Sequence, residues 1–350
     1  MSRPRRLAIL ACHRSIPARA GDMPVFARVL EELGHRITLN DDRPADLASH
    51  DLVVLWGSPG FFPRLRRQLV AEKGVRPPVA SLHAEPLPPP RASGLRRWSA
   101  LSASEVAKIL LCDWRATDIY TNAFKLRRVM REGSIDFLFP LSVEKLEYMR
   151  EHGYPAWPLW YGYHPSMGRL LGRDRDLDVL FLGDTRPPRR RRLLAELRAA
   201  GVPVTIRGSW HDSSSWGEGR TELLNRTKVI VHLQRYPGKL AAMRFVMAMA
   251  NGALVISEPV YKPEPFVDGR HYVTAPAAEM PAAIRYYLDH PAERERITEA
   301  AHGLVTDELR FERAMEAMLD IATGQPTASA AHGSTPTLGE SQSERAVSSR

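Results

Sequence analysis

One arginine lies in a long apolar stretch in the second half of the chain. Arg244 is the single charged residue in the segment 243–256. Apolar residues on most faces of the segment 240–250 predict a buried helix, in which an unpaired charge is costly. Arg244 therefore needs an anion. Two kinds remain open: phosphate groups of a ligand, or the carboxylate of Glu258 or another acidic residue.

Gly183 marks a second place where an anion could bind. It follows the strand-like run 176–182, and a basic helix is expected over 189–201. A glycine at this turn lets backbone amides approach a diphosphate, and the helix dipole favours negative charge. The guanidinium groups of Arg186 and Arg189–Arg192 match phosphate oxygens. The alternative is a tight turn beside a solvated basic face, because one glycine is a weaker signal than G-x-G-x-x-G.

Strands and helices alternate along the chain in two series. In the first, the patterns predict strands at 6–12, 36–39, 51–56, 78–83 and 116–124, a strand and loop within 134–142, and helices at 25–33, 103–112 and 142–153. In the second, they predict strands at 176–182, 202–208, 228–234 and 253–257, and helices at 189–201, 220–227, 240–250, 279–290, 292–307 and 311–322. The aromatic segment 154–168 is expected to be an ordered connector. This order predicts two parallel sheets, with a ligand at the carboxyl ends of their strands.

The composition is that of a globular protein with two domains. The chain has 350 residues, of which 44% are hydrophobic and 25% charged. No run approaches the ~18 uncharged apolar residues of a membrane helix, and the apolar start is too short for a secretory signal. Two cysteines give no disulfide framework, so a reducing cytoplasm is the expected location. The composition of 324–350 predicts a disordered tail.

The net charge of +9 allows several kinds of partner. Nucleic acid, an anionic membrane surface and a phosphorylated ligand compete to explain it. No nucleic-acid-binding pattern accompanies the basic run 186–192, so nucleic acid is not expected, whereas a peripheral membrane contact stays open. The simplest alternative is a solvated basic surface, common in high-GC bacterial proteins.

The order of segments resembles that of the GT-B glycosyltransferases, in the group 1 branch that includes CgeB-like, spore-maturation-type proteins. The resemblance rests on segments 180–194, 206–210, 225–238, 243–259, 266–273, 284–297 and 311–319. The first half fits by element order. The resemblance implies an α/β fold of two Rossmann-like domains facing each other across a cleft. The acceptor-side domain would span 1–160 and the nucleotide-sugar-binding domain 161–323.

The implied activity is transfer of a sugar from a nucleotide-sugar donor to an acceptor, with no metal or cofactor. In the resembled family the edge at Gly208–Trp210 lies near the nucleotide base; Trp210 either stacks on that base or is a partly buried loop aromatic. Glu258 either accepts bonds from sugar or ribose hydroxyls or pairs with Lys262 or Arg244. The expected donor-binding residues are Gly183, Asp184, Arg190, Gly208, Ser209, Trp210, Tyr236, Arg244, Ser257 and Glu258.

The sequence departs from the family at two positions. Retaining GT-B enzymes commonly carry a glutamate where this chain has Met247, and a second one where it has Lys239. The first of these glutamates normally binds the ribose hydroxyls, and methionine accepts no useful hydrogen bond. Three explanations stay open: another group holds the ribose, the donor differs, or the protein no longer turns over. The last makes a non-catalytic glycan- or partner-binding protein the alternative function.

Three residues after predicted strands could act as the base that deprotonates an acceptor hydroxyl. His83 and Glu85 end one strand and enter a proline-rich loop, and they are the first choice as catalytic residues. His13, beside Arg14, is the second. The alternative for each histidine is a structural role. His164, in the aromatic connector, is expected to pack where the domains join.

Overall fold

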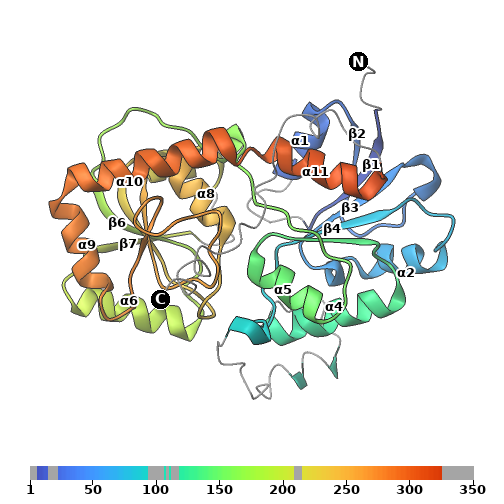
Figure 1. Cartoon of the computed structure of the whole chain (residues 1–350), viewed down its shortest axis with the longest axis horizontal. Helices are drawn as coiled ribbons and strands as arrows, with labels where there is room; N and C mark the ends of the chain where they lie inside the picture. Colours follow the sequence, from blue (N-terminus) through green and yellow to red (C-terminus); the bar gives the residue numbers. More distant parts are fainter. Residues whose placement is uncertain are drawn as a thin grey trace, which may run out of the picture.

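A computed structural model describes residues 6–14, 23–93, 106–107, 110–111, 118–208 and 215–324 of the chain. Two α/β halves lie side by side, each built on its own parallel sheet, as Figure 1 shows. The prediction of two parallel-sheet halves is therefore confirmed. The segment 325–350, most of the expected helix 103–112, Ser209 and Trp210 lie outside the described residues.

The first sheet has five parallel strands in the order β2-β1-β3-β4-β5. Its strands are β1 (Ala8–Cys12), β2 (Arg36–Asn40), β3 (Leu52–Trp56), β4 (Val79–His83) and β5 (Phe137–Pro140). Its helices are α1 (Val25–Glu32), α2 (Pro63–Ala71), α4 (Ile119–Glu132) and α5 (Val143–Glu151). Strands β3 and β4 are buried along most of their length. They read as continuous apolar runs because helices cover both faces of such a sheet.

The second sheet is also five-stranded and parallel, in the order β10-β9-β8-β6-β7. Its strands are β6 (Leu177–Leu182), β7 (Val204–Arg207), β8 (Thr227–His232), β9 (Leu254–Ser257) and β10 (Val273–Thr274). Its helices are α6 (Pro188–Ala199), α7 (Gly217–Asn225), α8 (Ala242–Ala250), α9 (Met280–Asp289) and α10 (Pro291–Gly303). Residues Phe245–Ala250 of α8 are buried, as its apolar sequence predicts.

Both sheets have the same strand order. When the strands of each half are numbered in chain order, the strand order of both sheets is 2-1-3-4-5. The chain therefore reverses its winding between the first and third strands of each sheet. A crevice forms at the carboxyl ends of that strand pair, where open α/β sheets bind ligands. In the first half this pair is β1 and β3; in the second it is β6 and β8. The fold thus selects the loops after Cys12, Trp56, Leu182 and His232.

The last helix, α11 (Phe311–Thr323), returns to the first half. The helix path runs from α10 across the top of Figure 1 to α11, which lies beside α1. Phe311 of α11 packs with Trp56 and Tyr161, with ring centroids 6.4 and 5.2 Å away. Although α11 follows the second half in the sequence, it therefore packs on α1 and β4 of the first half.

The predicted strand at 116–124 is wrong, because helix α4 begins at Ile119. The β-branched Ile119 and Thr121 favour a strand locally. Over a longer window, the buried positions Ile119, Asn122, Leu126 and Val129 are three or four residues apart, which is the spacing of one helix face. Tertiary burial of that face decides the outcome.

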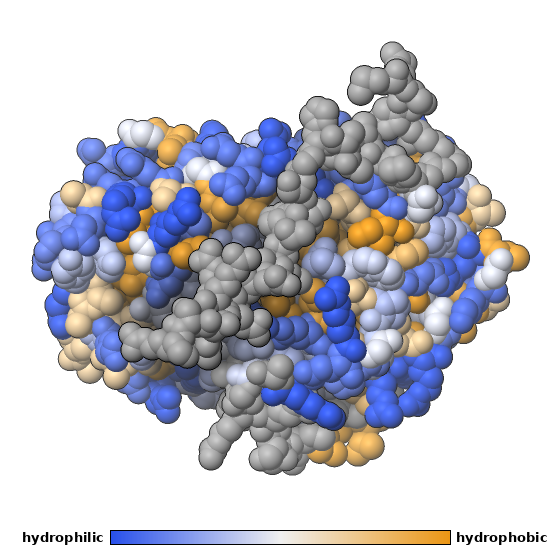
Figure 2. All heavy atoms as spheres, viewed as in Figure 1, coloured by the Kyte–Doolittle hydropathy of each residue, from blue (hydrophilic) through white to orange (hydrophobic). Residues whose placement is uncertain are grey.

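Among the described residues, no helix combines the length and apolarity needed to cross a membrane. Figure 2 shows polar residues over most of this face of both halves, with apolar residues in small separate patches.

Candidate functional site

Arg244 packs directly on Gly183 at the carboxyl end of β6. A Cβ atom placed on Gly183 would lie 2.8 Å from Nη2 of Arg244, so only glycine leaves room for the guanidinium. Within the described residues, the Arg244 side chain makes no hydrogen bond or ion pair. Burial lowers its pKa, and the charge of Asp184 opposes this shift. Arg244 also lies in the first turn of α8, whose dipole disfavours a cation. The arrangement therefore favours binding of an anion.

Arg190 is held beside Arg244 by backbone contacts. It is 8% exposed, and its Nε donates to the carbonyl of Leu233 at 2.9 Å while Nη1 donates to that of Asp184 at 3.2 Å. Burial lowers the pKa of Arg190 to about 9, with Arg244 the next cause. Two neighbouring guanidinium groups thus lie at the β6–β8 crevice with little negative charge between them.

Arg189 completes the group that we call the arginine cluster: Arg189, Arg190 and Arg244. Unlike the other two, Arg189 has a carboxylate partner, because Glu258 accepts from both of its terminal nitrogens. Glu258 is 4% exposed and also accepts from the backbone N–H of Gln234 at 2.8 Å. Of the pairings expected for Glu258, neither the one with Arg244 nor the one with Lys262 is formed. A role of Glu258 in sugar binding stays a prediction.

The other predicted donor residues lie on the same edge of the second sheet. A Cβ atom on Gly208 would be 3.0 Å from the backbone nitrogen of Gly183, so the two glycines let β6 and β7 end close together. Asp184 accepts from Arg186, which lowers its pKa. The buried Ser257 hydroxyl donates to the carbonyl of Glu258 at 2.8 Å.

His232, at the end of β8, is a site residue that sequence reasoning missed. It is 5% exposed, and burial lowers its pKa to about 3, followed by the charges of Arg244 and Arg190. It is therefore neutral at physiological pH and adds no charge to the arginine cluster. The available signal was its position, since it is the last residue of the strand that forms the crevice with β6.

Glu85 lies two residues after the carboxyl end of β4, beside Gly57 at the end of β3. Its carboxylate makes no hydrogen bond within the described part of the chain. Burial raises its pKa, and this shift is opposed by Lys145, Lys125, Arg14 and Arg235. The last of these belongs to the second half, so its charge acts on Glu85 from across the junction of the halves. A carboxylate with a raised pKa can accept a proton from a hydroxyl.

The two predicted histidine bases are less well placed. His83 is 0% exposed in β4, and burial lowers its pKa to about 3. An acceptor cannot reach this ring without movement of the sheet, so the functional proposal below does not use His83. His13 is partly exposed, with its ring centroid 6.5 Å from that of Phe26. Its role as a base stays a prediction.

Side chains of the second half contact the first half beside this site. Arg235 donates to Asp118 at 2.8 Å, and the hydroxyl of Tyr236, a predicted donor residue, lies 3.4 Å from the same carboxylate. Lys239 donates to Glu144 of α5. Lys239 and Met247 are the two positions at which the resembled family carries glutamates. The first therefore pairs with a carboxylate from the other half, and the second is 7% exposed in the core.

One group of side chains in the described ranges has the geometry to hold a metal ion. Ligand atoms of Glu32, His164 and Glu312 lie within 4.8 Å of one another. Nε2 of His164 is 2.9 Å from Glu32, so a hydrogen bond accounts for this contact without a metal. The group lies where α1 and α11 meet the connector, and the prediction that His164 packs at the junction of the halves stays a prediction.

The chain is similar to known proteins in part of its sequence and in its fold. Residues 189–320 match a family model described as glycosyl transferase-like. By structure, the chain is similar to Alr3699/HepE of Anabaena in complex with UDP and glucose, with a TM-score of 0.60 and 11% identity over 91% of this chain and 100% of that one. No curated protein matches the sequence.

Two further solved structures are similar. Sucrose-phosphate synthase from Thermosynechococcus elongatus has a TM-score of 0.60 at 12% identity, over 90% of this chain and 98% of that one. WaaG, a glycosyltransferase involved in lipopolysaccharide biosynthesis, has a TM-score of 0.55 at 14% identity, over 90% of this chain and 100% of that one. The fold is therefore GT-B, and the matched region of its second half is glycosyl transferase-like.

Proposed function

We propose that this protein transfers a sugar from a nucleotide-sugar donor to an acceptor hydroxyl at the junction of its two halves. The observation that carries the proposal is the Arg244 guanidinium, packed against Gly183 at the β6–β8 crevice without an ion-pair partner among the described residues. A donor diphosphate would supply the missing negative charge. The glycosyl transferase-like match over 189–320 supports the same conclusion.

We assign the residues the following roles. Arg244 and Arg190 bind the donor phosphates, because their charges are the least compensated at the site. Glu85 acts as the base toward the acceptor, since it follows the carboxyl end of β4 and has a raised pKa. Membership of the CgeB-like branch, a cytoplasmic location and chemistry without a metal or cofactor are parts of the same proposal, made from the sequence.

Substitution of Arg244 tests the donor site. Arg244→Gln should weaken binding of UDP, GDP or dTDP, whichever binds the unchanged protein, by about tenfold to a hundredfold, because a charge-assisted hydrogen bond to phosphate is lost. Isothermal titration measures the effect. Arg226→Gln is the matched control, since this arginine is exposed and pairs with Asp176, which precedes β6 at the opposite end of the sheet. If none of the three nucleotides binds the unchanged protein at millimolar concentration, the proposal fails.

Thermal unfolding of the ligand-free Arg244→Gln protein shows whether the substitution disturbs the fold. Because burial disfavours the charged form of Arg244, the ligand-free Arg244→Gln protein should melt no lower than the unchanged protein. A loss of nucleotide binding can then be separated from a loss of structure by thermal unfolding without ligand.

A second function is favoured by one observation. Met247 and the paired Lys239 leave the second half without either carboxylate of the resembled retaining enzymes. This would suit a GT-B protein that binds a glycan or a partner without turnover. Donor hydrolysis in the absence of acceptor separates the two functions: steady release of nucleotide supports the transferase, and tight binding without release supports the binding protein.

A further inference from the structure

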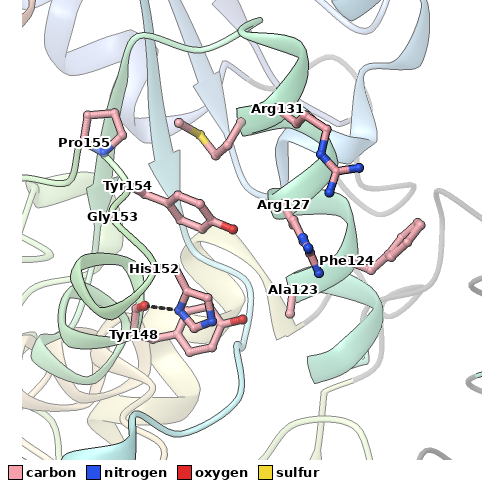
Figure 3. A pocket seen from close by; sticks show the side chains of 10 residues that line it. Ala123, Phe124, Arg127, Arg131, Tyr148, His152, Gly153, Tyr154 and Pro155 are labelled. Atoms are coloured by element: carbon pink, nitrogen blue, oxygen red, sulfur yellow. Dashed lines mark hydrogen bonds between the residues drawn. The ribbon is translucent and has the colours of Figure 1, made fainter.

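A pocket of about 880 Å³ lies in the first half, between α4 and the end of α5. Figure 3 shows its two walls: α4 carries Arg127 and Arg131 on one side, and Tyr148, His152 and Tyr154 line the other. None of the residues assigned to donor or acceptor binding lines it. Its volume is in the range of small-molecule sites, roughly 300–1,000 Å³.

The arginine wall carries uncompensated charge. Arg127 and Arg131 are one helical turn apart, so their like charges repel, and neither forms an ion pair or hydrogen bond with another described residue. Arg128, on the same helix, pairs instead with Glu132 at 2.8 Å. Both arginines line the pocket, and Figure 3 shows their side chains on its α4 wall. An anion between them would relieve the repulsion.

The opposite wall is aromatic with polar edges. The rings of Tyr148, His152 and Tyr154 follow one another, with centroids 4.2 and 5.8 Å apart. Nδ1 of His152 lies 2.7 Å from the carbonyl of Tyr148, and because a carbonyl only accepts, Nδ1 is the donor and Nε2 is the ring nitrogen left for a ligand. The hydroxyl of Tyr154 points across the pocket toward the arginines in Figure 3.

The charges of the two walls act on each other. Burial raises the pKa of the Tyr154 phenol, and the positive charges of Arg127 and Arg131 oppose that shift. Both guanidinium groups therefore act electrostatically on the tyrosine hydroxyl, and all three groups can contact one ligand. Two guanidinium forks and a hydroxyl match the oxygens of a phosphate group, while the rings can stack on an apolar or cyclic part.

We propose that this pocket binds a ligand carrying a phosphate group, held by Arg127 and Arg131 and packed against the rings of His152 and Tyr154. The phosphate belongs either to a soluble phosphorylated metabolite or to an anionic lipid headgroup, since both present the same oxygens. The inference is independent of the donor site, because it uses no residue of the arginine cluster.

The test uses a reporter inside the pocket. The ring signal of His152 in a carbon–proton NMR spectrum, assigned by its loss in His152→Asn, should move on titration with phenyl phosphate and not with phenol. The double substitution Arg127→Gln, Arg131→Gln should weaken this binding by about tenfold or more. The matched control Arg128→Gln, on the same helix but outside the pocket, should leave it unchanged. Because the signal is local, phosphate bound at the donor site does not contribute.

Vesicles distinguish the two sources of phosphate. If the ligand is a lipid headgroup, the protein should sediment with phosphatidylglycerol vesicles but not with phosphatidylcholine vesicles. The double variant should lose this sedimentation, and Arg128→Gln should keep it. This outcome supports the site. An NMR response to phenyl phosphate without sedimentation supports the site and identifies a soluble ligand. The inference is overturned if phenyl phosphate leaves the His152 signal unmoved and the vesicles retain no protein, or if Arg128→Gln weakens binding as much as the double variant.

Discussion

At the scale of single residues, the site is organised by charges that burial makes costly. Glu85 carries a carboxylate that burial disfavours, although four cations lie close enough to stabilise it. Across the junction, Arg244 and Arg190 carry positive charges that burial also disfavours. Such opposed shifts are typical of sites that take up a proton on one side and bind an anion on the other.

Glu85→Gln should remove the base and change the pH dependence of transfer. With a pKa above its ordinary value of 4.5, Glu85 should place the rising limb of kcat/KM above the usual carboxyl range. The variant should lose about a hundredfold or more of the rate and show no such limb. Initial rates measured across pH with the identified donor and acceptor check this. Glu147→Gln is a control carboxylate outside the proposed chemistry.

The stability of the same variant has a defined sign. A raised folded-state pKa means that the folded protein holds the proton more tightly than the unfolded chain, so stability falls as pH rises from 4.5 through the folded-state pKa. Glu85→Gln abolishes this loss. Its melting temperature should therefore rise relative to that of the unchanged protein over this window and keep the gain above it. An equal difference at pH 4 and pH 8 would contradict the assignment.

At the scale of elements, glycines determine how closely the strand ends approach the arginine cluster. Gly183 has φ +155°, and its missing Cβ is the space that the Arg244 guanidinium occupies. Gly208, with φ +95°, abuts the backbone of Gly183. Two strand ends and the first turn of α8 thus converge because neither glycine carries a side chain.

Gly183→Ala should displace Arg244 and weaken nucleotide binding by about tenfold, because the phosphate contact is lost. The unfolding free energy should also fall, by about 1 kcal/mol, from backbone strain. Gly201→Ala is the matched control: Gly201 has φ +78°, but its added Cβ would meet only Nη2 of Arg285, at 3.9 Å. Calorimetric titration and thermal unfolding of both variants separate the displaced arginine from strain alone. Equal affinity in the two variants would refute the packing argument.

Helices and strands were easier to predict from the sequence than contacts between side chains that are distant in the chain. Apolar periodicity located the helix at 240–250 and the strand before Gly183, because both patterns are local. The bidentate contact of Glu258 with Arg189, 69 positions away, was not predictable, since it depends on how the first turn of α6 meets the loop after β9. The strand assigned to 116–124 was wrong for a related reason: the burial of one face of α4 outweighed local β-propensity.

At the scale of the whole molecule, charged contacts from α5 connect the halves. Glu144 is 1% exposed and pairs with Lys239, whereas Glu147, nearly one turn later, binds Tyr261 and the exposed Lys262. Both acidic residues come from the first half and all their partners from the second. Breaking a buried pair costs more than breaking an exposed one, because the remaining charge stays without compensation.

The two glutamates therefore form a matched test of how the halves are held together. Glu144→Gln leaves the Lys239 charge buried and should favour separation of the halves, which a larger radius of gyration in small-angle X-ray scattering would reveal. Glu147→Gln should change the radius of gyration little, because Lys262 is solvated and such exposed pairs contribute about 1 kcal/mol or less. Transfer should slow in the first variant alone, since it requires Glu85 and the arginine cluster to face each other. If the two substitutions open the molecule equally, burial of the Glu144–Lys239 pair is not what holds the halves together.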